Sequence, residues 1–443
     1  MCSINCTMNK IKINSEYYKN IKWIKSSKRY DKILKCLNKY TPIQIVEIIC
    51  GYDYEFEGVE DCVLEGGHNV RIWDVFWLPN NKIISVGGKT NEAGYFMEDS
   101  NYKQIDLIVW DLIKQTKMRI SNDLDCYPYN LRFFILNSED NLFRAVGIPN
   151  NNKNTLKIWE ETGNDTNKSL QYERTFIGHT GNINSITILN DNRIVSCSDD
   201  KTFRIWNPFS GLCDNIFFGH TDRVLEVVVF SDDLIVSCSS DKTFRTWNTT
   251  SYECITTFNG HDGNSLELCF GVIECKKIKC DYNNSNDKLL VSLSAHAINV
   301  WNTYSGEIIR TIDISNDSNW LLDKTRNKCN CDGFVFSASN NKIINVWNIF
   351  DKNIKLELVG HTGHILGLTC LPDDKIVSVS EDNTIRVWDL NPSIIQDKKS
   401  ISISCKVIEM KTHDKGSMVE FIKPLPDGRL IGLQYNGLMT IWK

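Results

Sequence analysis

The segment Ser196–Asn207 reads SCSDDKTFRIWN, and related segments occur twice more along the 443-residue chain. They are SCSSDKTFRTWN at Ser237–Asn248 and SVSEDNTIRVWD at Ser378–Asp389. Each segment begins seventeen residues after the histidine of a Gly-His pair. A repeat with fixed internal spacing predicts a fold that is assembled from copies of one small unit.

Serine, histidine and aspartate in one window are also the residue types of an acyl-transfer triad. One catalytic centre does not need three distant copies, so we interpret the set as structural. Buried aspartate and imidazole groups are costly unless they are hydrogen-bonded, and a set of this kind satisfies its members internally. The predicted sets are His179, Ser196, Asp200 and Trp206; His220, Ser237, Asp241 and Trp247; and His361, Ser378, Asp382 and Trp388.

At these residues the sequence resembles the WD-repeat β-propeller family. The resemblance implies that the Gly-His pair opens each repeat and that the aspartate occupies the turn between its second and third strands. It also implies that the four side chains form one buried hydrogen-bonded network. The residue pattern agrees, because Thr202–Trp206 alternates with a period of two and Arg193–Ser196 is β-branched. We therefore expect an all-β fold.

A tryptophan that ends a predicted third strand recurs every 41 to 54 residues, near the roughly 40–45 residues of one four-stranded blade. They fall at Trp110, Trp159, Trp206, Trp247, Trp301, Trp347, Trp388 and Trp442. Eight blades are expected, with seven as the alternative if the Trp159 unit is not a repeat. Residues Asp61–Glu65 resemble an outer strand, which we expect to complete the last blade and close the ring.

Two regions are expected: an N-terminal extension over residues 1–57 and the propeller over residues 58–443. Residues 1–40 carry ten Lys and Arg against Glu16 and Asp31, with apolar residues at helical spacing. A packed basic helix is favoured over one that lies on nucleic acid or an anionic membrane. Residues 40–54 resemble the opening of an F-box, as in F-box/WD-repeat substrate receptors of cullin-type ubiquitin ligases, but the segment is too short for three helices.

The overall composition argues against several classes of function. The net charge of −5 gives no signature of nucleic-acid binding over the whole chain, and no run of eighteen apolar residues occurs. Without a recognisable secretory signal, the seventeen cysteines are expected to be thiols in a cytoplasmic or nuclear protein. No phosphate-binding loop or metal-ligand spacing stands out, so we predict a monomeric, non-catalytic scaffold for other proteins, with no cofactor and no metal.

The resemblance also implies partner contacts on the narrow top face around the channel. The corresponding positions are Arg71, Trp73, Asn182, Asn184, Asp199, Arg223, Leu225, Ser240, Leu266, His364, Leu366 and Glu381. Two arginines facing two acids do not favour a phosphopeptide site, which needs converging arginines. Trp73 and the three leucines instead offer an apolar anchor for a peptide, or they pack between blades. The sequence leaves both interpretations open.

Overall fold

The computed structural model describes most of the chain after residue 59. The described residues are 60–64, 68, 71–78, 81–88, 105–124, 126, 131–137, 142–162, 169–231, 234–259, 269–273, 289–293, 297–302, 305–313, 327–329, 334–338, 342–348, 355–371, 375–389, 405–409, 419–425, 428–434 and 436–442. The predicted N-terminal helix, the F-box-like segment 40–54 and Leu266 therefore lie outside the described residues.

The described strands form eight four-stranded antiparallel sheets. The first four are β2 (Ile72–Leu78), β3 (Lys82–Gly88), β4 (Ile105–Asp111) and β5 (Thr116–Leu124); β6 (Arg132–Asn137), β7 (Leu142–Gly147), β8 (Thr155–Thr162) and β9 (Ser169–Ile177); β10 (Ile183–Ile188), β11 (Ile194–Ser198), β12 (Phe203–Trp206) and β13 (Cys213–Phe217); and β14 (Val224–Ser231), β15 (Leu234–Ser239), β16 (Thr243–Asn248) and β17 (Cys254–Asn259).

The other four sheets have the same strand order. They are β18 (Cys269–Ile273), β19 (Leu289–Leu293), β20 (Ala297–Asn302) and β21 (Ile308–Asp313); β22 (Asn327–Cys329), β23 (Phe334–Ala338), β24 (Ile343–Asn348) and β25 (Lys355–Val359); β26 (Ile365–Cys370), β27 (Lys375–Ser380), β28 (Thr384–Asp389) and β29 (Cys405–Glu409); and β30 (Val419–Pro424), β31 (Leu430–Gln434), β32 (Met439–Trp442) and β1 (Glu60–Leu64).

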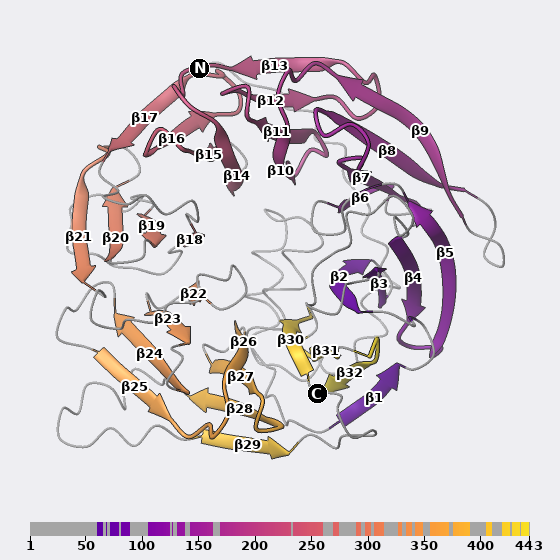
Figure 1. Ribbon diagram of the computed structural model, residues 1–443, viewed down its shortest axis with the longest axis vertical. Helices are drawn as coiled ribbons and strands as arrows, with labels where there is room; N and C mark the ends of the chain where they lie inside the picture. Colours follow the sequence, from indigo (N-terminus) through magenta and orange to yellow (C-terminus); the bar gives the residue numbers. More distant parts are fainter. Residues whose placement is uncertain are drawn as a thin grey trace, which may run out of the picture.

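The sheets are arranged around a common centre, as Figure 1 shows. The first strand of each repeat faces the centre, and the outer strands, among them β5, β9, β13 and β17, follow the periphery. The last sheet takes its outer strand from the start of the described chain, because β1 pairs antiparallel with β32 through Val63–Thr440 and Leu64–Met439. The expected closure by an N-terminal strand is therefore confirmed. Trp73 lies on the inner strand β2.

Aromatic side chains join neighbouring sheets. Phe203 and Phe217 stack at 4.1 Å between ring centroids, and both meet the edge or face of Trp247 in the next sheet at 5.2 and 5.5 Å. Phe244 and Phe258 make the same contacts with Trp301, each at 5.6 Å. Burial of each such side chain contributes roughly 1.5–3 kcal/mol. The tryptophan that ends a third strand therefore anchors its sheet to the preceding one.

In the part of the chain that the structure describes, there is no helix of sufficient length and apolarity to cross a membrane.

Candidate functional site

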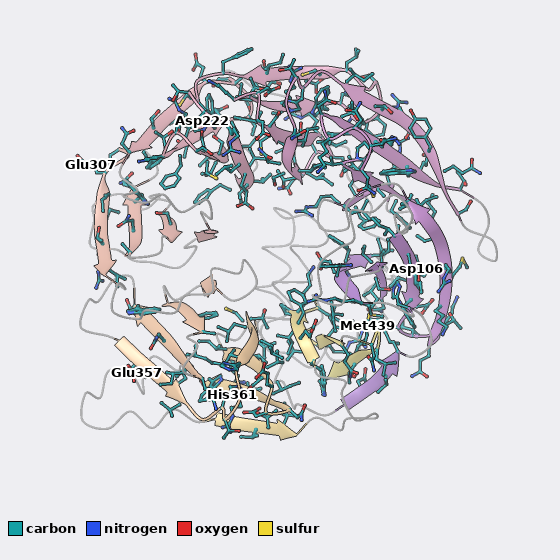
Figure 2. All side chains as sticks on the ribbon, in the orientation of Figure 1. Asp106, Asp222, Glu307, Glu357, His361 and Met439 are labelled. Atoms are coloured by element: carbon teal, nitrogen blue, oxygen red, sulfur yellow. The ribbon has the colours of Figure 1, made fainter. Side chains whose placement is uncertain are left out.

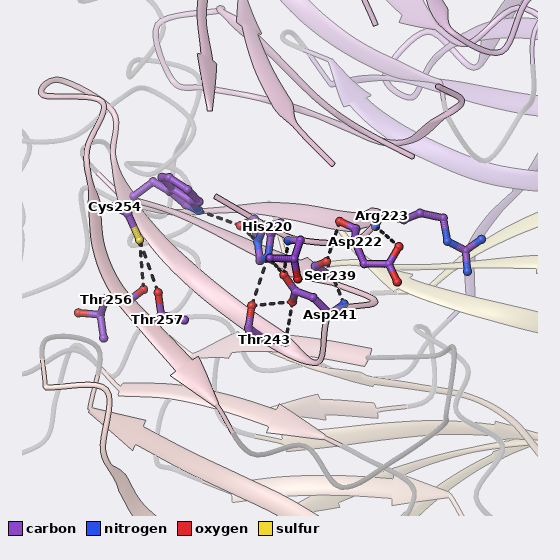
Figure 3. A network of polar contacts seen from close by, with 12 residues as sticks. His220, Asp222, Arg223, Ser239, Asp241, Thr243, Cys254, Thr256 and Thr257 are labelled. Carbon is purple, nitrogen blue, oxygen red and sulfur yellow. Dashed lines mark hydrogen bonds and ion pairs between the residues drawn. The ribbon is translucent and has the colours of Figure 1, made fainter. Parts of the chain in front are cut away.

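The four polar and aromatic positions of the repeat meet in one buried network, shown for the β14–β17 sheet in Figure 3. His220 lies 2.9 Å from Asp241 Oδ2 through Nδ1 and 2.8 Å from Ser237 Oγ through Nε2. Trp247 Nε1 donates to the same Ser237 Oγ at 2.8 Å. The histidine thus connects the turn between the second and third strands to the tryptophan on the third strand.

The other two predicted sets have the same geometry. In the β10–β13 sheet, His179 lies 2.7 Å from Asp200 and 2.8 Å from Ser196, which accepts from Trp206 at 2.8 Å. In the β26–β29 sheet the distances from His361 to Asp382 and Ser378 are 2.8 and 2.7 Å, and Trp388 donates to Ser378 at 2.9 Å. Each serine is fully buried and both ring nitrogens of each histidine are occupied, so the arrangement leaves no accessible nucleophile.

Two further contacts hold each aspartate, and sequence reasoning did not identify them. A threonine two residues after the aspartate donates from Oγ1 to Oδ1 at 2.6 Å in all three sheets, from Thr202, Thr243 and Thr384. The backbone N–H after each histidine donates to Oδ2, from Thr180, Thr221 and Thr362 at 3.0, 2.9 and 2.8 Å. The sequence feature that could have identified this contact is the threonine two residues after the aspartate in all three segments. Each aspartate therefore accepts several hydrogen bonds that hold its turn in one conformation.

These contacts shift the titration of both partners. Burial by itself would raise the pKa of Asp241, but hydrogen bonds from Thr243, the Thr221 N–H and His220 outweigh it and lower the pKa to about 2. The same hydrogen bonds hold the pKa values of Asp200 and Asp382 below their usual range. Burial lowers the pKa of His220 and His361, against the opposing attraction of their aspartates. The networks of His220 and His361 thus favour an ionised aspartate beside a neutral histidine.

A fourth network occurs in the β2–β5 sheet, with an aspartate from a different position. His68 lies 2.6 Å from Ser85, and Trp110 donates to Ser85 at 2.7 Å, as the common spacing implies. Its acidic partner is Asp106, whose Oδ2 lies 2.9 Å from His68 Nδ1 and which stands on the third strand after the insertion. Figure 2 shows Asp106 in this sheet, with the sheet of Met439 between it and the sheet of His361. Asp106 is a site residue that the fixed repeat spacing missed.

The β6–β9 sheet has a different polar core. Its third strand ends near Trp159, yet the buried cation is Arg144, which pairs with Glu160 at 3.2 Å and Glu173 at 3.1 Å. The Arg144 guanidinium also lies 5.3 Å from the ring centroid of Phe209 in the neighbouring repeat. An arginine with two carboxylates satisfies its buried charge, so this sheet is stabilised without the histidine network.

The structure brings the predicted top-face positions together in pairs. Asn182, Arg223 and His364 each stand immediately before an inner strand, and their carbonyls accept from the N–H groups of Asp199, Ser240 and Glu381 at 2.8, 2.9 and 2.9 Å. The side chains of Asn182, Arg223, His364 and Glu381 are exposed. Figure 3 shows Arg223 directed away from the buried network.

The remaining predicted positions are engaged with neighbouring strands. Asn184 Nδ2 donates at 2.9 Å to Asp199 and at 2.9 Å to the Val224 carbonyl of the next sheet. Leu225 and Leu366 pack against buried hydrophobic clusters between sheets. The packing interpretation therefore applies to these two leucines.

Arg71 and Trp73 stand on the sheet beside the ring closure. Arg71 forms an ion pair with Glu420 on β30 at 2.9 Å. Its guanidinium also lies 4.9 Å from the Trp73 ring centroid. Arg71 is thus committed to a contact between the first and last sheets rather than to an open surface.

Among the described residues, no group of three or more His, Cys, Asp or Glu side chains is placed to hold a metal ion. Residues 170–207, 211–248 and 352–389 each match the WD40 family, described as WD domain, G-beta repeat. Each matched range ends one residue beyond its network tryptophan, and the three networks have the geometry given above. These three segments are WD40 repeats, and the sheets that contain them belong to a propeller-like ring of four-stranded sheets. WD40 propellers are generally non-catalytic and typically serve as protein-interaction scaffolds.

Individual relatives match over parts of this propeller. The small ribosomal subunit protein RACK1 of Caenorhabditis elegans is 31% identical over 75 residues, which are 17% of this chain and 23% of that protein. The serine-threonine kinase receptor-associated protein of Mus musculus is 23% identical over 147 residues, 31% of this chain and 37% of that protein. The matches thus span well under two thirds of either relative.

One solved structure supports the fold over a greater length. The computationally designed Ika8 protein superposes with a TM-score of 0.56 at 19% sequence identity, and the match covers 87% of this chain and 99% of that one. At this identity the likeness concerns the fold alone.

Proposed function

We propose that this chain is a non-catalytic scaffold whose eight sheets are the blades of one closed ring, and that partner proteins bind its top face. The observation that carries the proposal is the repeated exposure of a polar side chain directly before an inner strand. Asn182, Arg223 and His364 occupy this position, while the histidine networks behind them are buried. Buried networks fix the backbone, and the exposed side chains remain available to a partner.

The face has mixed character. Arg223 and Glu381 bear opposite charges, Asn182 and His364 carry polar side chains, and the leucines behind them are packed between sheets. Such a surface suits a folded domain or peptide that carries both charges better than it suits a highly phosphorylated one.

The test is a quantitative pull-down with the full chain and its Asn182→Ala/Arg223→Ala variant. We expect partners recovered by the wild type to be reduced at least about tenfold by the double substitution, because exposed interface arginines are common hot spots. Lys114→Ala is the matched control, since Lys114 is exposed in the turn between β4 and β5 at the other end of its sheet. Equal recovery by a folded double variant would contradict the top-face assignment.

The alternative function is a substrate receptor of a cullin-type ubiquitin ligase, which rests on the F-box-like residues 40–54. The same pull-down addresses it, because a receptor would recover a cullin and its F-box adaptor. A second full-chain variant, Pro42→Asp, would then lose the ligase while retaining the top-face partners. Recovery of top-face partners without a ligase component would favour the scaffold.

A further inference from the structure

We propose a second binding site on the outer rim of the β10–β13 and β14–β17 sheets, for a peptide segment in which acidic side chains flank an apolar one. The site is centred on Phe218 between Arg204 and Arg245, and we call these three residues the rim site. It is distinct from the top-face positions, which border the inner strands.

Phe218 is the apolar centre of the rim site. It follows the outer strand β13, and 70% of its surface is exposed, whereas the preceding Phe217 is 3% exposed and packs against Trp247. Large exposed aromatic side chains contribute binding energy when a partner covers them. Burial of Phe218 by a partner would therefore be favourable.

Arg204 borders Phe218 within the same sheet. The register pairs Arg204 with Ile216, so Phe218 is the diagonal neighbour of Arg204 on the same face. The guanidinium lies 5.8 Å from the Trp206 ring centroid, and its position is confined by Gly178, where an added Cβ would come within 2.5 Å of Nη1. Arg204 is thus held in place by packing.

Arg245 borders Phe218 from the next sheet. Gly219, the residue after Phe218, has a φ of +147°, and a Cβ there would lie 2.8 Å from Arg245 Nη1. The positive φ favours glycine at this position, and the missing side chain leaves room for the guanidinium beside the backbone. Phe218 and its two flanking arginines consequently form one continuous stretch across two neighbouring sheets.

Neither arginine is neutralised by a carboxylate in the described part of the chain. The Nε atoms of Arg204 and Arg245 are buried without a hydrogen-bond partner. Among the described residues, Arg204 hydrogen-bonds the Cys213 thiol, and neither guanidinium is paired with a carboxylate. Arg144 in the adjacent β6–β9 sheet contrasts with them, because two glutamates accompany it. Planar guanidinium groups bind carboxylates in two-point contacts, so they are complementary to acidic side chains.

The pattern continues past Arg204 toward the β6–β9 sheet. Ile177 is 78% exposed and directly precedes Gly178, the glycine against which Arg204 packs. The order along the rim is therefore apolar, cationic, apolar, cationic, through Ile177, Arg204, Phe218 and Arg245. Alternation of this kind is complementary to an extended segment that alternates apolar and acidic residues.

A matched control exists in another sheet. Arg386 lies against Gly360 and 5.9 Å from the Trp388 ring centroid, as Arg204 lies against Gly178 and Trp206. Its diagonal neighbour beyond Val407 is an acidic residue, Glu409, in place of an aromatic one. Arg386→Gln thus removes an arginine with the same glycine and tryptophan contacts as Arg204, at a place without Phe218.

The test selects binders from a random twelve-residue peptide library displayed on phage, with the full chain as bait. Enriched peptides are then synthesised with a fluorescent label, and fluorescence anisotropy gives their affinities for the variants. We expect a class of acidic peptides with an aromatic or aliphatic residue between the acids, whose affinity falls at least tenfold with Arg204→Gln and with Phe218→Ser. Arg386→Gln and Asn182→Ala/Arg223→Ala should leave that affinity within twofold.

Three outcomes would overturn the rim site. The first is that no enriched peptide responds to Arg204→Gln or Phe218→Ser. The second is equal weakening by Arg386→Gln, which would assign the loss to folding. The third is that anionic phospholipid vesicles or duplex RNA bind with the same dependence on Arg204 but without dependence on Phe218. Loss of top-face partners in the pull-down would leave all three criteria unaffected, so the two proposals fail separately.

Discussion

At the scale of single residues, each network serine is a junction rather than a nucleophile. Ser237 Oγ meets His220 Nε2 at 2.8 Å and Trp247 Nε1 at 2.8 Å, and the residue has no exposed surface. A tryptophan N–H can only donate, so the serine oxygen must accept from it. The hydroxyl proton then points away from the indole N–H. The shared serine fixes the imidazole and the indole relative to each other. Serine, histidine and aspartate recur here because they connect strands.

The networks predict that stability falls on acidification in two stages. The pKa values of His220 and His361 are lowered by folding, so their neutral forms stabilise the protein above pH 6.5, and this contribution is lost as pH falls through the folded pKa. Asp241, with a folded pKa of about 2, stabilises the protein above pH 3.8 and loses that contribution toward pH 2. Urea unfolding at a series of pH values measures both stages.

The control for the first stage is His364→Asn, because His364 is exposed and outside the networks. This variant should keep the loss of unfolding free energy between pH 6.5 and pH 5. His220→Asn should diminish that loss while being less stable at pH 7. A wild-type unfolding free energy that is constant from pH 7 to pH 5 would contradict the neutral-histidine assignment.

At the scale of elements, the sequence predicted most of the third and outer strands because their patterns are local. The predicted strand Thr202–Trp206 and the predicted outer strand Asp61–Glu65 lie within one residue of β12 and β1. Asp106 could not be predicted in this way, because an insertion separates it from the turn that carries the aspartate elsewhere. Its contact with His68 depends on where the strand re-enters the sheet, which spacing does not encode.

Asp106 therefore offers a test at the level of one sheet. If it replaces the turn aspartate energetically, His68→Ala and Asp106→Asn should each destabilise the protein by about 1–3 kcal/mol. The double variant should lose less than the sum, with a coupling of roughly 1 kcal/mol or more. Urea unfolding of the four proteins gives the cycle. Additive effects would show that the 2.9 Å contact between His68 and Asp106 contributes little.

The neighbouring sheet also decides which of the predicted top-face positions are exposed and which are packed. Positions three residues after the histidine lie before an inner strand and are exposed at Asn182, Arg223 and His364. Positions five residues after it fall within the strand, where Leu225 and Leu366 pack between sheets. A repeat pattern can locate both positions, but it does not state which of them the neighbouring sheet covers.

At the scale of the whole molecule, the ring depends on the pairing of β1 with β32. The sheet that contains β30, β31 and β32 is completed only by β1, which comes from the other end of the described chain. Arg429 and Asp61 form an ion pair at 3.1 Å across this junction, and Arg71 and Glu420 form another at 2.9 Å between the first and last sheets. An unpaired β32 would expose a sheet edge, which propellers avoid by closure.

The closing strand therefore has an effect beyond its five residues. Leu64 is 6% exposed and belongs to the hydrophobic cluster that joins the last sheet to the first, with Met439 and Ile441 among its members. Leu64→Ala should lower the unfolding free energy by about 2–5 kcal/mol. Because the lost contacts are at the junction, amide hydrogen exchange should accelerate first in β1 and β32, while β12 and β16 keep their protection.

The matched control is Ile177→Ala, since Ile177 is 78% exposed on another outer strand and should change the unfolding free energy by less than about 0.5 kcal/mol. Uniform acceleration across all sheets would mean that the ring opens only by global unfolding, and the junction would then be no weaker than any other contact between sheets.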